Sequence, residues 1–142
     1  MRALLDVNVL LALFDARHVH HRRARAWWMG AREHGWASCP ITENGFLRIC
    51  SQKAYANPLP LADALALLRQ WAKPPLHEHW PDDVSLLDGA VIDHGRVLGP
   101  RQLTDIYLLA LAARHGGRLV TLDTGISLQA VRGASAEHLV TL

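Results

Sequence analysis

Cysteine is scarce in this 142-residue chain, and its two cysteines form no metal-binding or disulfide motif. Cys39 and Cys50 stand in apolar surroundings and show neither a CxxC pair nor the Cys/His spacing of a zinc site. We therefore expect two reduced, buried thiols, as in proteins of a reducing compartment. Folds that depend on disulfides or on structural zinc are excluded.

Long hydrophobic runs are missing as well. A helix that crosses a bilayer needs about 20 predominantly apolar residues. Here Asp6 and Asp15 bracket the longest apolar run near the N-terminus, and Asp105 and Arg114 bracket the richest later one. Asp6 also follows only three apolar residues, too few for the apolar region of a secretory leader. We expect an unprocessed, cytoplasmic chain without a membrane span.

The chain also lacks a large excess of charge of either sign. The formal net charge of +2 is too small to indicate a nucleic-acid partner by itself. Lys53 and Lys73 are the only lysines, and the other thirteen basic residues are arginine, whose planar fork matches phosphate oxygens. With half of its residues hydrophobic, ten glycines and seven prolines, the chain is neither disordered nor fibrous. This length and composition predict one domain over residues 1–142.

Apolar segments of two kinds alternate along the chain, short β-type runs and longer runs of helical period. We expect strands at 2–5, 36–38, 76–80, 118–122 and 138–142, and helices at 7–14, 20–33, 40–50, 61–71, 84–93 and 106–114. Thr104 has the chemistry of an N-cap for the last of these helices, and Asp123 is expected to begin a further short one. Such alternation predicts an α/β fold with a short, mostly parallel sheet and helices on both faces.

Four acids fall at equivalent places in this pattern. Asp6 and Asp123 directly follow predicted strands, while Glu43 and Asp105 lie in the first turns of predicted helices. Chemistry in an open parallel sheet gathers beyond the carboxyl ends of the strands. Each acid alone has a structural explanation, since acids are favoured at helix starts and in turns. Four together would repel one another, and a divalent cation is the usual way to keep them ionised.

Oxygen ligands without histidine or cysteine favour Mg²⁺ or Mn²⁺ over Zn²⁺. Such a metal pocket suits cleavage of a phosphodiester. Four short motifs then carry a resemblance: Leu4-Leu5-Asp6-Val7-Asn8-Val9-Leu10, Thr42-Glu43-Asn44-Gly45-Phe46, Thr104-Asp105-Ile106-Tyr107-Leu108-Leu109-Ala110 and Leu119-Val120-Thr121-Leu122-Asp123. In this order and spacing the chain resembles the PIN-domain ribonucleases, most closely the VapC toxins of bacterial type II toxin–antitoxin systems. The resemblance covers essentially the whole chain.

The resemblance implies a PIN-like domain that acts as a Mg²⁺- or Mn²⁺-dependent endoribonuclease and is held inactive by a cognate VapB-like antitoxin. It implies that Asp6 and Asp105 are the principal metal ligands and that Glu43 and Asp123 complete the acidic pocket. It also implies a homodimer, an RNA substrate and an antitoxin whose tail wraps the toxin near its cleft. The side chains that would orient water molecules or the acids are Asn8, Thr104 and Thr121.

A basic stretch follows the first predicted helix and contains Arg17, Arg22, Arg23 and Arg25. It is a candidate track for an RNA backbone, and a solvated helix face explains the same residues. His77 and His79 share one face of a predicted strand; without a third ligand we interpret them as surface or hydrogen-bonded histidines.

Two other classes of protein compete with the ribonuclease. Haloacid-dehalogenase-type phosphatases also place an aspartate after the first strand, but they need a second acid two residues later, where this chain has Asn8. A PIN-like module that only binds RNA or protein is the non-catalytic alternative. Loss of the acids would mark such a module, and all four are present.

Overall fold

Five short strands form one parallel sheet in the computed structural model, which describes residues 1–142. The strands are β1 (Ala3–Leu5), β2 (Trp36–Ser38), β3 (His77–His79), β4 (Arg118–Thr121) and β5 (Leu139–Thr141). They lie in the order β3-β2-β1-β4-β5, and all four neighbouring pairs are parallel. The predicted α/β fold with a parallel sheet is confirmed.

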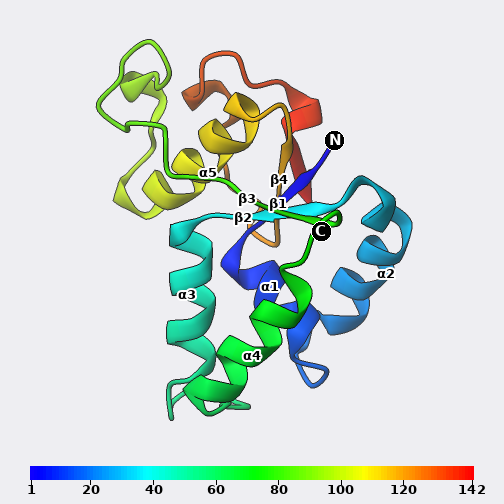
Figure 1. The fold of residues 1–142 in the computed structure, drawn as a ribbon. Helices are drawn as coiled ribbons and strands as arrows, with labels where there is room; N and C mark the ends of the chain where they lie inside the picture. The colour runs from blue at the N-terminus through cyan, green and yellow to red at the C-terminus, as the bar shows by residue number, and fades with distance from the viewer.

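Helices cover both faces of this sheet, as predicted. In Figure 1, α1 to α4 lie on one face, and α5 lies on the other together with the C-terminal segments. None of the five has the length and apolar character needed to span a bilayer. The α-helices are α1 (Val7–Phe14), α2 (His21–Ala31), α3 (Pro40–Cys50), α4 (Leu61–Trp71) and α5 (Leu103–Arg114). Short 3₁₀ turns are η1 (Arg32–His34), η2 (His94–Arg96), η3 (Pro100–Gln102), η4 (Leu128–Ala130) and η5 (Ala136–His138).

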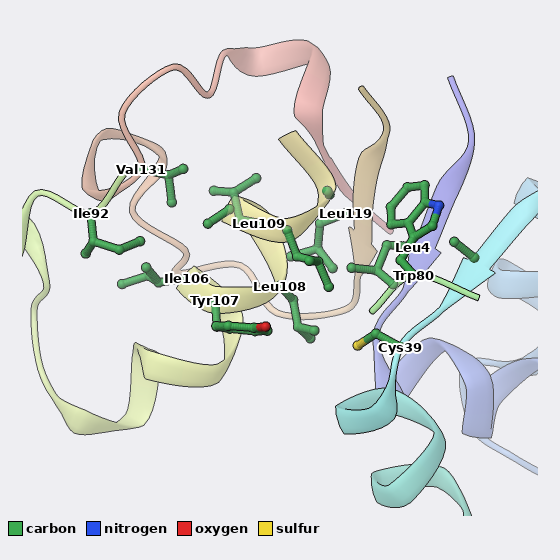
Figure 2. Close-up of a cluster of buried hydrophobic side chains, with 14 of the residues drawn as sticks. Leu4, Cys39, Trp80, Ile92, Ile106, Tyr107, Leu108, Leu109, Leu119 and Val131 are labelled. Carbon is green, nitrogen blue, oxygen red and sulfur yellow. The ribbon is translucent and has the colours of Figure 1, made fainter. Parts of the chain in front are cut away.

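The side chains of the central strand β1 are buried on both faces of the sheet. Successive side chains of a strand point to opposite faces, so each of them meets a different helical layer. Leu5 packs into the hydrophobic cluster beneath α1 to α4, together with Val9 and Phe46. Leu4 points the other way and packs with Leu108 of α5 (Figure 2). The apolar run before Asp6 is therefore what a strand between two helical layers requires.

The strand order creates a switch point between β1 and β4. The chain runs outward from β1 to β2 and β3, and then returns to the other side of β1 to form β4 and β5. Loops that leave neighbouring strands in opposite directions open a crevice at the carboxyl ends. Asp6 follows β1 and Asp123 follows β4, so both acids stand at this crevice.

The predicted helix over 84–93 is wrong, and local hydrogen bonds explain why. The Ser85 hydroxyl and the Asp88 carboxylate each accept a hydrogen bond from the backbone N–H two residues later, at 3.1 and 2.9 Å. Such bonds stabilise turns in competition with a helix. Ile92 is instead drawn into the core, where it is 1% exposed and forms an antiparallel bridge with Val131.

Two predicted helix starts are also wrong. Thr104 does not cap α5, because η3 leads directly into the helix and Gln102 occupies the N-cap position. No helix begins at Asp123, whose backbone N–H donates instead to Thr121 Oγ1 at 3.1 Å. The helical turn nearest in the chain after it is η4.

Candidate active site

Three acids from distant parts of the chain converge at the switch point. Each of Asp6, Asp105 and Asp123 offers a carboxylate oxygen, and these three oxygens all lie within 4.8 Å of one another. Asp6 is the N-cap of α1, Asp105 lies in the first turn of α5, and Asp123 follows β4. The structure thus brings together three of the four acids that the sequence analysis selected.

Asp6 is the most buried of the three, at 6% exposed. Its Oδ1 accepts a hydrogen bond from the Val7 backbone N–H at 2.7 Å, and its Oδ2 accepts one from the Thr121 hydroxyl at 2.7 Å. The pKa of Asp6 lies above its usual value, chiefly because of burial and also because of the nearby charge of Asp123, although these two donors act to lower it. The site is therefore costly to ionise without a cation.

Asn8 links the acids that follow the two strands. Its Nδ2 donates to Asp123 Oδ2 at 3.1 Å and to Thr121 Oγ1 at 3.3 Å, while its Oδ1 accepts from the Leu122 backbone N–H at 3.1 Å. Thr121 in turn donates to Asp6. Asn8 and Thr121 thus lie among the acids, where the sequence analysis expected them.

Asp105 has a different environment from Asp6. Its carboxylate accepts no hydrogen bond from the protein, and it takes part in none of the ion pairs. Burial, followed by the charges of Asp6 and Asp123, raises the pKa of Asp105 to about 6. A carboxylate that is crowded by like charges and has no protein donor is suited to binding a cation.

The three acids fit a hard divalent cation. No lysine or arginine forms an ion pair with Asp6, Asp105 or Asp123, so the protein does not neutralise them itself. Carboxylate oxygens without histidine or cysteine form the ligand set preferred by such ions. The cluster is therefore consistent with a metal site.

Glu43 lies outside this group of three. It stands in the first turn of α3, after β2, so it belongs to the strand next to β1 in the sheet. Its Oε1 accepts hydrogen bonds from the Ser38 hydroxyl at 2.6 Å and from His79 Nδ1 at 2.9 Å. His77, a buried neighbour, contacts the same hydroxyl through Nε2 at 2.8 Å.

These contacts show what the sequence analysis missed. It did not single out Ser38, and it treated His79 as a surface or hydrogen-bonded side chain without naming Glu43 as its partner. His77 and His79 do occupy one face of a strand, as the i, i+2 spacing predicted. The sequence around Glu43 does not indicate that β3 lies beside β2. Only that strand pairing brings His77 and His79 close to Ser38 and Glu43.

The remaining predicted residues are dispersed. Thr104 is exposed and its hydroxyl makes no hydrogen bond within the protein. Arg17 lies in the turn after α1, at the opposite end of that helix from Asp6. Arg22 is exposed on α2, and Arg25 lines an apolar groove between α1, α2 and α4.

Among the four arginines of the basic stretch, Arg23 reaches the edge of the sheet at which the strands end. It donates to the carbonyl oxygen of Leu142 at 2.8 Å. The Leu142 backbone N–H donates to the Thr121 carbonyl at 2.9 Å, so Leu142 lies beside the strand end that leads into Asp123. The four arginines therefore do not form one strip, and Arg23 has the position nearest to what was expected.

Sequence comparison agrees with this geometry. The PIN domain family matches residues 3–132. Ribonuclease VapC44 of Mycobacterium tuberculosis is 56% identical over 142 residues, which is all of both chains. In the same organism, Ribonuclease VapC39 is 44% identical over 135 residues, 94% of this chain and 96% of the relative, and Ribonuclease VapC38 is 42% identical over 142 residues, 99% of each. With these full-length matches and three converging aspartates at a sheet switch point, the chain belongs to the PIN-domain family, in its VapC group.

Proposed function

We propose that this chain is the toxin of a type II toxin–antitoxin system and acts as a metal-dependent endoribonuclease that hydrolyses RNA phosphodiester bonds. The observation that carries the proposal is the convergence of Asp6, Asp105 and Asp123 within 4.8 Å, in a chain similar along its full length to proteins named ribonucleases. Three close carboxylates without a protein counter-charge are chemically matched to a divalent cation and, through it, to a phosphodiester.

Mg²⁺ or Mn²⁺ is the ion that we propose for this pocket, because its ligands are carboxylate oxygens. When bound, such an ion activates water and offsets negative charge that develops on the phosphate. Asp6 and Asp105 would be the principal ligands and Asp123 the third. Asn8 and Thr121 would keep the acids in place, a role supported by their hydrogen bonds to Asp123 and Asp6.

Glu43 would complete the acidic pocket from the neighbouring strand end. The support is its place in the first turn of α3, after a strand that pairs with β1. Its carboxylate is about one-third exposed, so it is accessible to a substrate or to water. The role of Thr104 rests on the resemblance alone, because its hydroxyl forms no hydrogen bond with the acids.

The RNA backbone needs cations near the acids, and Arg23 has the best-supported position. Its guanidinium is anchored at the C-terminal residue of the chain, next to the strand end that precedes Asp123. An arginine at this edge of the sheet can contact an RNA phosphate. Arg17, Arg22 and Arg25 stay sequence-based predictions for RNA binding.

A VapB-like antitoxin and a second copy of the chain are the protein partners that we propose. The antitoxin is supported by an apolar groove lined by Leu5, Leu13, Phe14, Trp28, Trp36 and Trp71, with Arg25 as its one charged residue. Such a surface suits the apolar side chains of a protein segment better than a polyanion. The homodimer rests on the family resemblance.

RNA cleavage by the purified chain, freed of antitoxin, tests the proposal. We expect cleavage of single-stranded RNA with Mg²⁺ or Mn²⁺ and none after EDTA is added. Asp6→Asn removes a charged ligand while keeping the shape of the side chain, so it should abolish cleavage without changing the circular dichroism spectrum. Cleavage in EDTA, or full activity of the variant, would contradict the mechanism.

The same assay separates the alternatives. A PIN-like module that only binds RNA would retain RNA in a mobility-shift experiment but leave it intact with every metal. A haloacid-dehalogenase-type phosphatase would need proton transfer at position 8, where the Asn8 amide instead donates to Asp123 and Thr121. Release of inorganic phosphate from a small phosphomonoester would favour that class.

A further inference from the structure

A chain of hydrogen bonds connects the edge strand β3 to Glu43. His77 Nε2 contacts Ser38 Oγ at 2.8 Å, Ser38 Oγ contacts Glu43 Oε1 at 2.6 Å, and His79 Nδ1 contacts the same Oε1 at 2.9 Å. The parallel register places Ser38 opposite His79. These side chains thus share one face of the sheet, the face covered by α3.

The chemistry of the groups assigns the protons. An ionised Glu43 accepts hydrogen bonds and donates none, so the single Ser38 proton points to Oε1. Ser38 Oγ must then accept from His77, which places a proton on His77 Nε2. Burial lowers the pKa of His77, so the ring is neutral and has one N–H to donate. His77 is 8% exposed and packs against Trp36, with ring centroids 4.4 Å apart, which holds the imidazole in place.

The network acts on one oxygen of Glu43 and leaves the other available. Two donors converge on Oε1, whereas Oε2 accepts no hydrogen bond from the protein. Glutamate is longer than aspartate and loses more rotamer freedom when it is held still. Asp6 has a backbone donor to orient it, but Glu43 has side-chain donors alone. Two hydrogen bonds to a carboxylate oxygen are both strengthened by its charge, and His77 orients one of the donors, Ser38. Together they can hold such a carboxylate before substrate arrives.

We propose that Ser38, His77 and His79 are positioning residues for catalysis, which hold Glu43 Oε1 so that Oε2 faces the reacting phosphate or its attacking water. The inference rests on the proposed ribonuclease function and deepens it. A purely structural alternative is that the network only ties β3 to α3, in which case the donors would matter for stability and not for turnover.

Matched substitutions separate the two roles. At His79, which is about half exposed, His79→Ala removes the donor and His79→Asn keeps an N–H where Nδ1 stood. At His77, His77→Phe keeps a ring against Trp36 but has no donor, whereas His77→Gln loses the ring and keeps an N–H where Nε2 stood. We expect kcat on a single-stranded RNA with Mn²⁺ to fall about 10- to 100-fold in the Ala and Phe variants, with KM changed less than about threefold. The Asn and Gln variants should stay within about fivefold of the parent kcat.

Mn²⁺ binding without RNA gives a readout besides activity. The three converging aspartates are untouched in these variants, so the Mn²⁺ dissociation constant measured by electron paramagnetic resonance should stay within about threefold of the parent value. Urea unfolding of each variant shows whether the fold is intact.

The opposite ranking contradicts the proposal. Equal kcat for His79→Ala and His79→Asn would overturn it, and so would a His77→Phe variant more active than His77→Gln, since ring packing would then be what matters. Loss of Mn²⁺ binding in step with kcat would also overturn it, because the network would then serve the metal pocket. If the unsubstituted protein cleaves no RNA, both this inference and the proposed function are wrong. If it cleaves RNA and the two variants at each histidine are equally active, this inference alone is wrong.

Discussion

Single neutral side chains decide how the acids of the pocket are arranged. Thr121 is fully buried and donates to Asp6 Oδ2 at 2.7 Å, and it accepts from Asn8 and from the Asp123 backbone N–H. A buried carboxylate that loses one of its two donors has a less compensated charge, which destabilises the folded state. One hydroxyl group therefore supports two of the three acids.

Thr121→Val keeps the shape of this side chain and removes the hydroxyl. We expect the free energy of unfolding to fall by about 1–3 kcal/mol at neutral pH, because buried Asp6 loses a donor. Thr141→Val is the control, since Thr141 is the exposed register partner of Thr121 on β5 and should change stability by less than about 0.5 kcal/mol. Urea unfolding measures both. Equal effects would show that the hydroxyl does not stabilise Asp6.

Asp105 makes stability depend on pH. Burial and the neighbouring acids raise its pKa from 3.8 to about 6 in the folded protein, so the folded state binds more protons than the unfolded state between these values. The metal-free protein gains stability from this group below pH 3.8 and loses it as the pH rises through 6. Asp105→Asn should therefore be more stable than the parent at pH 7.5, by about 1 kcal/mol after allowing for partial exposure to water.

This difference should shrink as the pH falls to 4, because the Asp105 carboxyl of the parent is then protonated in the folded state and partly protonated in the unfolded state. Chemical unfolding of both proteins in EDTA at pH 4, 6 and 7.5 measures it. A variant that is less stable than the parent at every pH would assign Asp105 a structural role at the start of α5.

Among the helices, the close approach of α1 and α3 brings the first turn of one against the middle of the other. A Cβ added at Gly45 of α3 would lie 2.5 Å from Val7 Cγ2 of α1, closer than real contacts allow. Gly30, on α2, has no atom within 4 Å of such a Cβ. The two glycines therefore offer the same substitution in a tight and in an open helix position.

Gly45→Ala should lower the free energy of unfolding by about 1–2 kcal/mol, because the clash with Val7 outweighs the better helix propensity of alanine. Gly30→Ala should raise it by up to about 1 kcal/mol, since propensity acts there without a clash. Thermal unfolding followed by circular dichroism gives both values. If both variants were stabilised, α1 and α3 would have room to move apart.

Across the whole molecule, the pocket joins parts of the chain that are far apart in sequence. Asp6 is the N-cap of α1, Asp105 lies in the first turn of α5, and Asp123 follows β4. An ion shared by the three would therefore link the helices on both faces of the sheet (Figure 1). A ligand that binds only the folded state stabilises it by mass action.

Mg²⁺ at ten times its dissociation constant should raise the free energy of unfolding of the parent by about 1.4 kcal/mol. Asp123→Asn should lose most of this increment, because it removes one ligand charge. Asp93→Asn should keep it, since Asp93 pairs with Arg96 and Arg132 outside the pocket. Unfolding curves with and without Mg²⁺ test the three proteins. If Mg²⁺ raised the free energy of unfolding equally in both variants, the ion would bind at another site.

The sequence by itself determined most of the secondary structure and the class of fold. Apolar alternation and helical period are local patterns, so β1, α1, α3 and α4 form within one residue of where they were predicted. The prediction of a helix over 84–93 is wrong for two reasons, one local and one distant in sequence. Ser85 and Asp88 favour turns, and the core site that Ile92 fills, beside Val131, exists only after the chain has folded.

The sequence also determined which acids follow strands or begin helices, and it predicted the convergence of Asp6, Glu43, Asp105 and Asp123, of which Asp6, Asp105 and Asp123 lie together. Only the tertiary structure decided that Glu43 lies apart from them, held by Ser38 and His79. It alone decided that Asp105 has a raised pKa while it has no protein donor. The physical reason is that local patterns depend on neighbours within a few residues, whereas charge, burial and hydrogen bonding at a site depend on which strands pair and which helices pack.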